Sequence, residues 1–178
     1  MVLEKQDPPL SLRVTSESTP LMDTVLLREA TAEDAPALAA VIQAAFEEYR
    51  GRLDPPSGAH AESVQSIRLK LTTVRAVVAS VNQDIVGCAF YEPEADYFYL
   101  GRVAVLPQYR LQGIGRKLIA LVETQARSLG FARVRLAVRV VLTDNRAWYE
   151  RLGYRLHSYG THAGYSEPTY LNLEKNVA

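Results

Sequence analysis

The chain has 178 residues, a length that suits one domain and is short for two. Hydrophobic residues make up 48% of it, which is enough for a core without disulfides or a structural metal, and 20 basic residues balance 20 acidic ones. This balance argues against a broad nucleic-acid-binding surface, which would carry an excess of Lys and Arg.

Cysteine, histidine and hydropathy patterns exclude further classes of protein. The one cysteine, Cys88, lies in an apolar run and is predicted to be a buried strand residue rather than a catalytic thiol. His60, His157 and His162 lack the spacing of metal ligands, so no metal is expected. No apolar run approaches the roughly 18 residues of a membrane span. Together with the low cysteine content, this predicts a cytoplasmic protein without membrane contact.

The first 22 residues differ from the rest of the chain. They are polar, contain Pro and Ser, and show no hydrophobic periodicity, which predicts a disordered leader over residues 1–22. They also lack the apolar core of a signal peptide. Hydrophobic periodicity begins directly afterwards and predicts one domain over residues 23–178.

Helical and strand-like periodicities alternate through this domain. Thr31 and Asp34 form a capping-box pattern that predicts a helix start. Gly101, inside a strand-like run, predicts a bulge or a close backbone approach. This alternation predicts an α/β or α+β sheet with helices on both faces. The predicted strands are 24–28, 75–81, 85–91, 97–106, 134–142, 154–159 and 169–173, and the predicted helices are 35–49, 64–71, 113–129 and 145–152.

The sharpest motif is a strand, a glycine loop and a helix in succession. Gly113 and Gly115 stand at the start of the predicted helix, where glycine lets the backbone turn tightly and approach a ligand. A helix N-terminus offers unpaired N–H groups and the positive end of the dipole. With Arg110, Arg116 and Lys117 nearby, the motif predicts a phosphate or pyrophosphate site. A tight turn without a ligand is the alternative.

Two other phosphate loops do not fit this segment. The Rossmann fingerprint needs a third glycine where Leu118 stands, and the Gly-Lys-Ser/Thr of the P-loop is absent. Instead, Arg110-Leu111-Gln112-Gly113-Ile114-Gly115 resembles the Arg/Gln-x-x-Gly-x-Gly/Ala motif of the GNAT acetyltransferase family, and Val103-Ala104-Val105 before Pro107 has the family's spacing. The resemblance covers most of the chain from Leu26 onward. Leu111 departs from many members, which carry Gly at this variable position.

The resemblance implies the GNAT fold, a mixed and mostly antiparallel sheet of about six to seven strands flanked by about four helices. It also implies acetyl-CoA as co-substrate and no metal. The backbone of Val103 to Val105 would pair with the pantetheine arm, the amides of Leu111 to Arg116 would hold the pyrophosphate, and an amide near Val105 would stabilise the oxyanion. The implied cofactor-binding residues are Val103, Ala104, Val105, Arg110, Leu111, Gln112, Gly113, Ile114, Gly115, Arg116, Asn145 and Tyr149.

A second segment contributes a candidate catalytic residue. Asp144 or Asn145 is predicted to cap a short helix that Gly153 ends. The segment resembles a GNAT pattern in which a tyrosine hydroxyl lies beside the cofactor sulfur. A phenol has a pKa of about 10 and is protonated at neutral pH, so the resemblance implies Tyr149 as the general acid. It also implies that Asn145 contacts the cofactor arm. An ordinary packed tyrosine and a simple cap are the alternatives.

The sequence does not assign a general base. Some relatives place a Glu where Tyr99 stands, and tyrosine is a poor base at neutral pH. Glu92, Glu94 and Asp96 could act through water, although a solvated acidic loop is the favoured interpretation of these three residues. His162 and water alone are the remaining alternatives.

The resemblance places the acceptor among residues 47–50, 51–58 and 162–165. Acidic residues there would favour a cationic amine, and arginines would favour an amine that carries a carboxylate. The sequence does not distinguish between these two classes of acceptor. We expect transfer of an acetyl group to a primary amine by direct attack, with a small molecule favoured. A protein lysine or N-terminal acetyltransferase and a non-catalytic acyl-CoA sensor are the alternatives, and the chain is expected to be a monomer or homodimer. Tyrosines that could line an aromatic pocket are Tyr91, Tyr97, Tyr99, Tyr165 and Tyr170.

Overall fold

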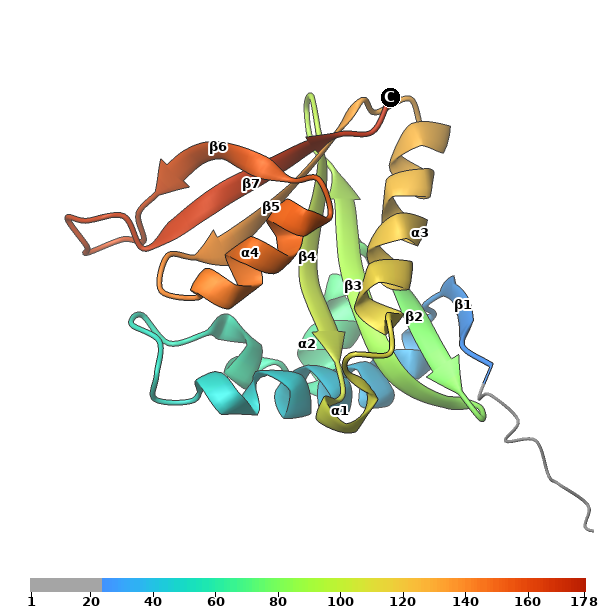
Figure 1. Cartoon of the computed structure of the whole chain (residues 1–178). Helices are drawn as coiled ribbons and strands as arrows, with labels where there is room; N and C mark the ends of the chain where they lie inside the picture. Colours follow the sequence, from blue (N-terminus) through green and yellow to red (C-terminus); the bar gives the residue numbers. More distant parts are fainter. Residues whose placement is uncertain (1–23) are drawn as a thin grey trace, which may run out of the picture.

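The computed structural model describes residues 24–178 (Figure 1). The predicted leader over residues 1–22 lies outside the described residues. The strands are β1 (Leu26–Glu29), β2 (Arg75–Val81), β3 (Asp84–Pro93), β4 (Phe98–Val105), β5 (Arg133–Arg139), β6 (Arg155–Gly160) and β7 (Tyr170–Asn176). They form one sheet in the order β1-β2-β3-β4-β5-β7-β6. All neighbours are antiparallel except β4 and β5, so the predicted mixed, mostly antiparallel sheet is confirmed.

Helices cover both faces of this sheet, each over its own core. They are α1 (Ala35–Phe46), α2 (Val64–Lys70), α3 (Ile114–Ser128) and α4 (Thr143–Arg151). On one face α1 and α2 bury Leu38, Ile42 and Ile67 with Cys88 of β3. On the other face α3 buries Leu118, and α4 packs beside it (Figure 1). Strands covered on both sides need apolar residues at successive positions, which explains the nearly continuous buried runs of β2 and β3. Cys88 is a buried strand residue, as predicted.

The two predicted helix starts have different outcomes. The backbone N–H of Thr31 donates to the Asp34 carboxylate at 2.8 Å, so the predicted capping box is confirmed, on a short 3₁₀ turn that leads into α1. The predicted cap of α4 is wrong. This helix begins two residues before Asn145, and Leu142 precedes it without any side-chain cap. Asp144 and Asn145 therefore lie in the first turn, which frees the Asn145 side chain for a contact elsewhere.

None of the helices in residues 24–178 combines the length and apolarity that crossing a bilayer requires.

Candidate active site

The strands β4 and β5 separate soon after they meet. They pair only at Phe98 with Val134 and at Tyr99 with Arg135. Beyond these pairs a cavity of about 1070 Å³ opens, lined by residues 99–105 of β4 and 136–139 of β5. Buried backbone N–H and C=O groups need partners, so the facing edges of the two strands suit an extended ligand that pairs with them.

A bulge turns β4 at the same place. Cys88 pairs with Ala104 and Phe90 with Gly101, so β4 has one more residue than β3 between these pairs. The predicted bulge is present and directly follows Gly101, and its left-handed residue is Arg102, at φ 48°. Gly101 instead leaves room for a ring, because a Cβ there would lie 3.1 Å from Cε1 of Tyr99. The bulge thus turns the Arg102 side chain to line the cavity.

The α3 N-terminus lies at the other end of the cavity and has the geometry of an anion site. Gly113 precedes the helix at φ 78° with open space beside it. The first helical hydrogen bond runs from Lys117 N to Gly113 O at 3.0 Å, so the three amides before Lys117 have no acceptor within the helix. Arg116 is exposed beside them and lines the cavity. Unpaired amides at the positive end of a helix dipole fit a phosphate or pyrophosphate.

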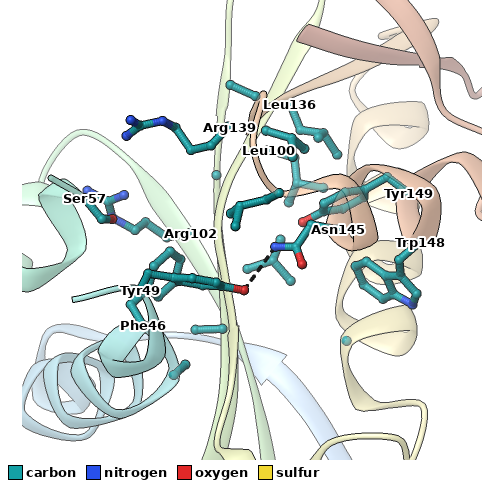
Figure 2. A pocket seen from close by; sticks show the side chains of 18 of the residues that line it. Phe46, Tyr49, Ser57, Leu100, Arg102, Leu136, Arg139, Asn145, Trp148 and Tyr149 are labelled. Carbon is teal, nitrogen blue, oxygen red and sulfur yellow. Dashed lines mark hydrogen bonds between the residues drawn. The ribbon is translucent and has the colours of Figure 1, made fainter. Parts of the chain in front are cut away.

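The α4 helix contributes aromatic side chains to this end of the cavity. The Trp148 ring packs against the start of α3, where a Cβ on Gly115 would lie 3.3 Å from it. The rings of Trp148 and Tyr149 meet edge to face at 4.8 Å. Burial raises the pKa of Tyr149, and the neighbouring Tyr49 and Tyr99 raise it further, so its phenol stays protonated at neutral pH. Asn145 Nδ2 donates to the Tyr49 hydroxyl at 3.3 Å across the cavity (Figure 2).

The loop 51–58 borders the cavity at the end away from α4. Arg139 of β5 holds this loop by donating to the carbonyl oxygens of Asp54 and of Pro55, the latter at 2.8 Å. The Tyr165 hydroxyl donates to the Asp54 carboxylate and ties the β6–β7 connection to the same loop. In Figure 2 the Arg102 and Arg139 guanidinium groups lie toward Ser57, away from the aromatic residues of α4.

The sequence model described as the acetyltransferase (GNAT) family matches residues 38–154. This chain belongs to the GNAT family. Its activity is therefore acetyl-CoA-dependent N-acetyl transfer, as the resemblance implied.

Relatives and solved structures agree with this assignment. The chain is 30% identical over 127 residues to an IAA acetyltransferase of Azospirillum brasilense, across 69% of this chain and 82% of the relative. Its fold matches the PaiA N-acetyltransferase of Thermoplasma acidophilum in complex with coenzyme A, with a TM-score of 0.72 at 17% identity over 86% of this chain and 99% of that one. It also matches the ribosomal-protein-S18-alanine N-acetyltransferase of Escherichia coli, with a TM-score of 0.69 at 20% identity over 87% and 95% of the two chains.

Nearly all the residues that the GNAT resemblance implied for cofactor binding line the cavity. Gln112 does not, and its side chain donates to the Gln108 carbonyl at 3.3 Å. Arg110 lines the cavity, but its guanidinium is engaged by the protein, at 2.8 Å from the Glu48 carboxylate and 2.8 Å from the Ala45 carbonyl. The residues of this implied set that line the cavity are Val103, Ala104, Val105, Arg110, Leu111, Gly113, Ile114, Gly115, Arg116, Asn145 and Tyr149.

The structure distinguishes the candidate general bases by whether they line the cavity. Glu92, Glu94 and Asp96 do not line the cavity, and Asp96 forms an ion pair with Arg133 at 3.1 Å. Tyr99 and His162 do line it. Burial raises the pKa of Tyr99, which makes it a poorer base still.

Sequence reasoning missed three residues of this GNAT site. Trp148 was given no role in the site, although its ring packs against the α3 N-terminus. Arg102 and Arg139 were not predicted because their roles depend on the bulge and on the distant loop 51–58. A signal existed for Trp148 alone, since a large aromatic residue next to Tyr149 is a natural partner for a helical glycine.

Proposed function

We propose that this GNAT enzyme acetylates the primary amine of a small molecule by direct attack on acetyl-CoA between β4 and β5. The observation that carries the proposal is the composition of the cavity wall. It includes the α3 N-terminus and Tyr149 at one end, and the loop 51–58 at the other. Such a cavity can hold the thioester and the amine in contact, and proximity of this kind supplies several kcal/mol of catalysis.

The donor occupies the α3 end. The amides of Ile114, Gly115 and Arg116 hold the pyrophosphate, and the backbone of Val103 to Val105 pairs with the pantetheine arm as an added strand would. This assignment is supported by the unpaired amides of α3 and by the unpaired edge of β4. It brings the thioester to the ring of Tyr149.

The reaction needs no covalent enzyme intermediate. The neutral amine attacks the thioester carbonyl carbon, an amide of β4 near Val105 stabilises the oxyanion, and the carbon–sulfur bond then breaks. Tyr149 donates a hydrogen bond to the departing sulfur. The pKa of a phenol, about 10, already lies above that of a thiol, about 8.5, and burial raises the pKa of Tyr149 further, so hydrogen bonding outweighs full proton transfer in this role. The amine proton passes to His162 or to water.

A small acceptor is favoured by the loop 51–58. Arg139 and Tyr165 tie this loop to the rest of the acceptor end through Asp54 and Pro55. A peptide would need an open groove at this end, whereas the tied loop narrows it.

The test is CoA release with panels of small amines and of peptides, measured for wild type and Tyr149→Phe. We expect Tyr149→Phe to lower kcat roughly tenfold to a hundredfold, because the sulfur loses a charge-assisted donor. Stabilisation by acetyl-CoA in thermal unfolding should not change. Tyr97→Phe removes a hydroxyl outside the cavity and is the matched control.

Four results would contradict parts of the proposal. Equal loss of turnover and of acetyl-CoA binding in Tyr149→Phe would remove its assigned role. Turnover of peptides but of no small amine would overturn the acceptor class. Acetyl-CoA binding without turnover of any amine would indicate a sensor, and no binding at saturating concentration would overturn the donor site.

A further inference from the structure

We propose that the acceptor carries a carboxylate and that Arg102 binds it at the end of the cavity away from Tyr149. This inference rests on the proposed function and adds the substrate class. It identifies the acceptor as a small amino acid in the broad sense, an amine and a carboxylate joined by a short chain.

The charges around the cavity support an anionic acceptor. Among the described residues that line it, the acidic side chain is Glu48, and Arg110 neutralises it at 2.8 Å. Arg116 lies at the α3 end with the proposed pyrophosphate site. The cations that remain for the acceptor end are Arg102 and Arg139. A dicationic amine would therefore meet like charge there, and an anionic group would meet opposite charge.

The two arginines are not equivalent. Arg139 uses all three of its guanidinium nitrogens on backbone carbonyl oxygens, those of Asp54, Pro55 and Thr169. Arg102 uses only Nε, which donates to Glu62 at 3.2 Å. Within residues 24–178, no hydrogen bond to the protein engages its two Nη groups, and its side chain is 30% exposed. A guanidinium with free Nη groups presents the fork that binds a carboxylate.

The surroundings of Arg102 hold this guanidinium in place and leave one positive charge. Glu62 is buried, and both Lys70 and Arg102 pair with it. Burial opposes ionisation of Glu62, but hydrogen bonds from Lys70 and Ser66 outweigh it and lower its pKa, so the carboxyl is ionised. Two cations and one anion give a net charge of +1, which matches one carboxylate better than a doubly charged phosphate. Nη2 of Arg102 lies 3.1 Å from where a Gly58 Cβ would be, so the loop backbone confines it.

The backbone of Arg102 is a second, independent indication. Its φ of 48° is left-handed, a conformation that costs a non-glycine residue about 1 kcal/mol or more. Glycine would adopt it without strain. Strained residues of this kind cluster at ligand sites, and here the strain turns a guanidinium to line the cavity.

The experiment compares amines in matched sets. Each set holds an amino acid, its carboxamide and the amine without the carboxyl group, and the sets run from α-amino acids to longer ω-amino acids. CoA release at saturating acetyl-CoA gives kcat/KM for each compound with wild type and Arg102→Gln. The ratio of acid to neutral analogue, compared between the two enzymes, cancels differences in amine basicity.

We expect wild type to favour the acid of at least one set, and Arg102→Gln to reduce that ratio by on the order of ten- to a hundredfold. Arg102→Lys keeps the charge without the fork and should retain part of the preference. Arg68→Gln removes an exposed arginine on α2, outside the cavity, and should leave the ratio unchanged.

A second readout requires neither turnover nor a stable variant. The N-acetylated acids and N-acetylated amides are products, and their binding to the wild-type enzyme with CoA is measured by thermal stabilisation. Preference for the acids supports the inference. Equal binding of acids and amides, or an acid-to-neutral ratio that survives Arg102→Gln, overturns it. Absence of turnover with every amine overturns the proposed function instead, and the product-binding preference still decides the carboxylate site.

Discussion

Leu111 and Arg102 both hold a left-handed backbone, at φ 63° and 48°, that L side chains seldom adopt. The two residues differ in what the side chain does there. Arg102 lines the cavity and pairs with buried Glu62, whereas the Leu111 side chain is fully exposed. The strain at Arg102 therefore has a compensating contact, and the strain at Leu111 has none.

Leu111→Gly tests this difference. Glycine removes the left-handed strain, and no buried contact is lost, so we expect a gain in stability of about 1 kcal/mol, or roughly 2–4 °C in Tm. Thermal unfolding without ligand is the measurement. Leu111→Ala keeps the Cβ and the strain, and its Tm should stay close to that of wild type. A lower Tm for Leu111→Gly would show that the loop is not strained at this residue.

Among single residues, those of the glycine-loop and tyrosine motifs could be proposed from the sequence, and those at the acceptor end of the cavity could not. Gly113 and Tyr149 lie in contiguous patterns that resemble those of the GNAT family, so each could be proposed from its own neighbours in the sequence. Arg102 depends on an extra residue in β4 relative to β3, and its partner Glu62 is 40 residues away. No local pattern in the sequence encodes either fact.

At the scale of elements, the loop 51–58 is held by residues that are distant in the sequence. Its carbonyl groups at Asp54 and Pro55 accept from Arg139, which also donates to Thr169 at 3.3 Å. One side chain at the end of β5 thus joins two connections that are distant in sequence. Pro and Gly content predicts that such a segment is a loop, but not what holds it.

Arg139→Gln should release this loop. A shorter neutral side chain cannot reach three carbonyls, so we expect faster hydrogen exchange at the loop amides and a KM for the acceptor that rises by about tenfold. The affinity for acetyl-CoA should not change. Arg133→Gln is the matched control, because Arg133 lies on the same strand outside the cavity, in an exposed ion pair with Asp96. Equal effects of the two variants would exclude a specific role for Arg139.

For the whole molecule, periodicity predicted the strands and helices well because both cores are strongly apolar. The predicted start of α4 was wrong because the side chains of this helix are exposed or half-buried, with no fully buried stripe, and no side-chain cap marks its first residue. The placement of β7 between β5 and β6 was not predicted, since strand order is set by long-range pairing. Family resemblance, rather than periodicity, indicated where the cofactor would bind.

Cys88 offers a measure of how the whole molecule opens. The thiol is fully buried between β3 and α1, and burial raises its pKa to about 12. We expect it to react with a thiol reagent only when the fold opens. Acetyl-CoA at a hundred times its Kd should slow this reaction about a hundredfold, because ligand binding stabilises the folded state by about 2.7 kcal/mol. Rapid labelling of the native protein, or labelling that acetyl-CoA does not slow, would contradict this expectation.

A continuous β-sheet separates the molecules bound on one of its faces from those bound on the other. The early parting of β4 and β5 cuts a slot through this sheet, because the cavity touches α3 and α4 on one side and the α1 side on the other. In the proposed arrangement the donor and the acceptor approach this slot from opposite sides of the sheet, so we expect either one to be able to bind first. The order in which the two substrates bind is therefore not fixed by the sheet, because β4 and β5 pair at only two positions, Phe98 with Val134 and Tyr99 with Arg135.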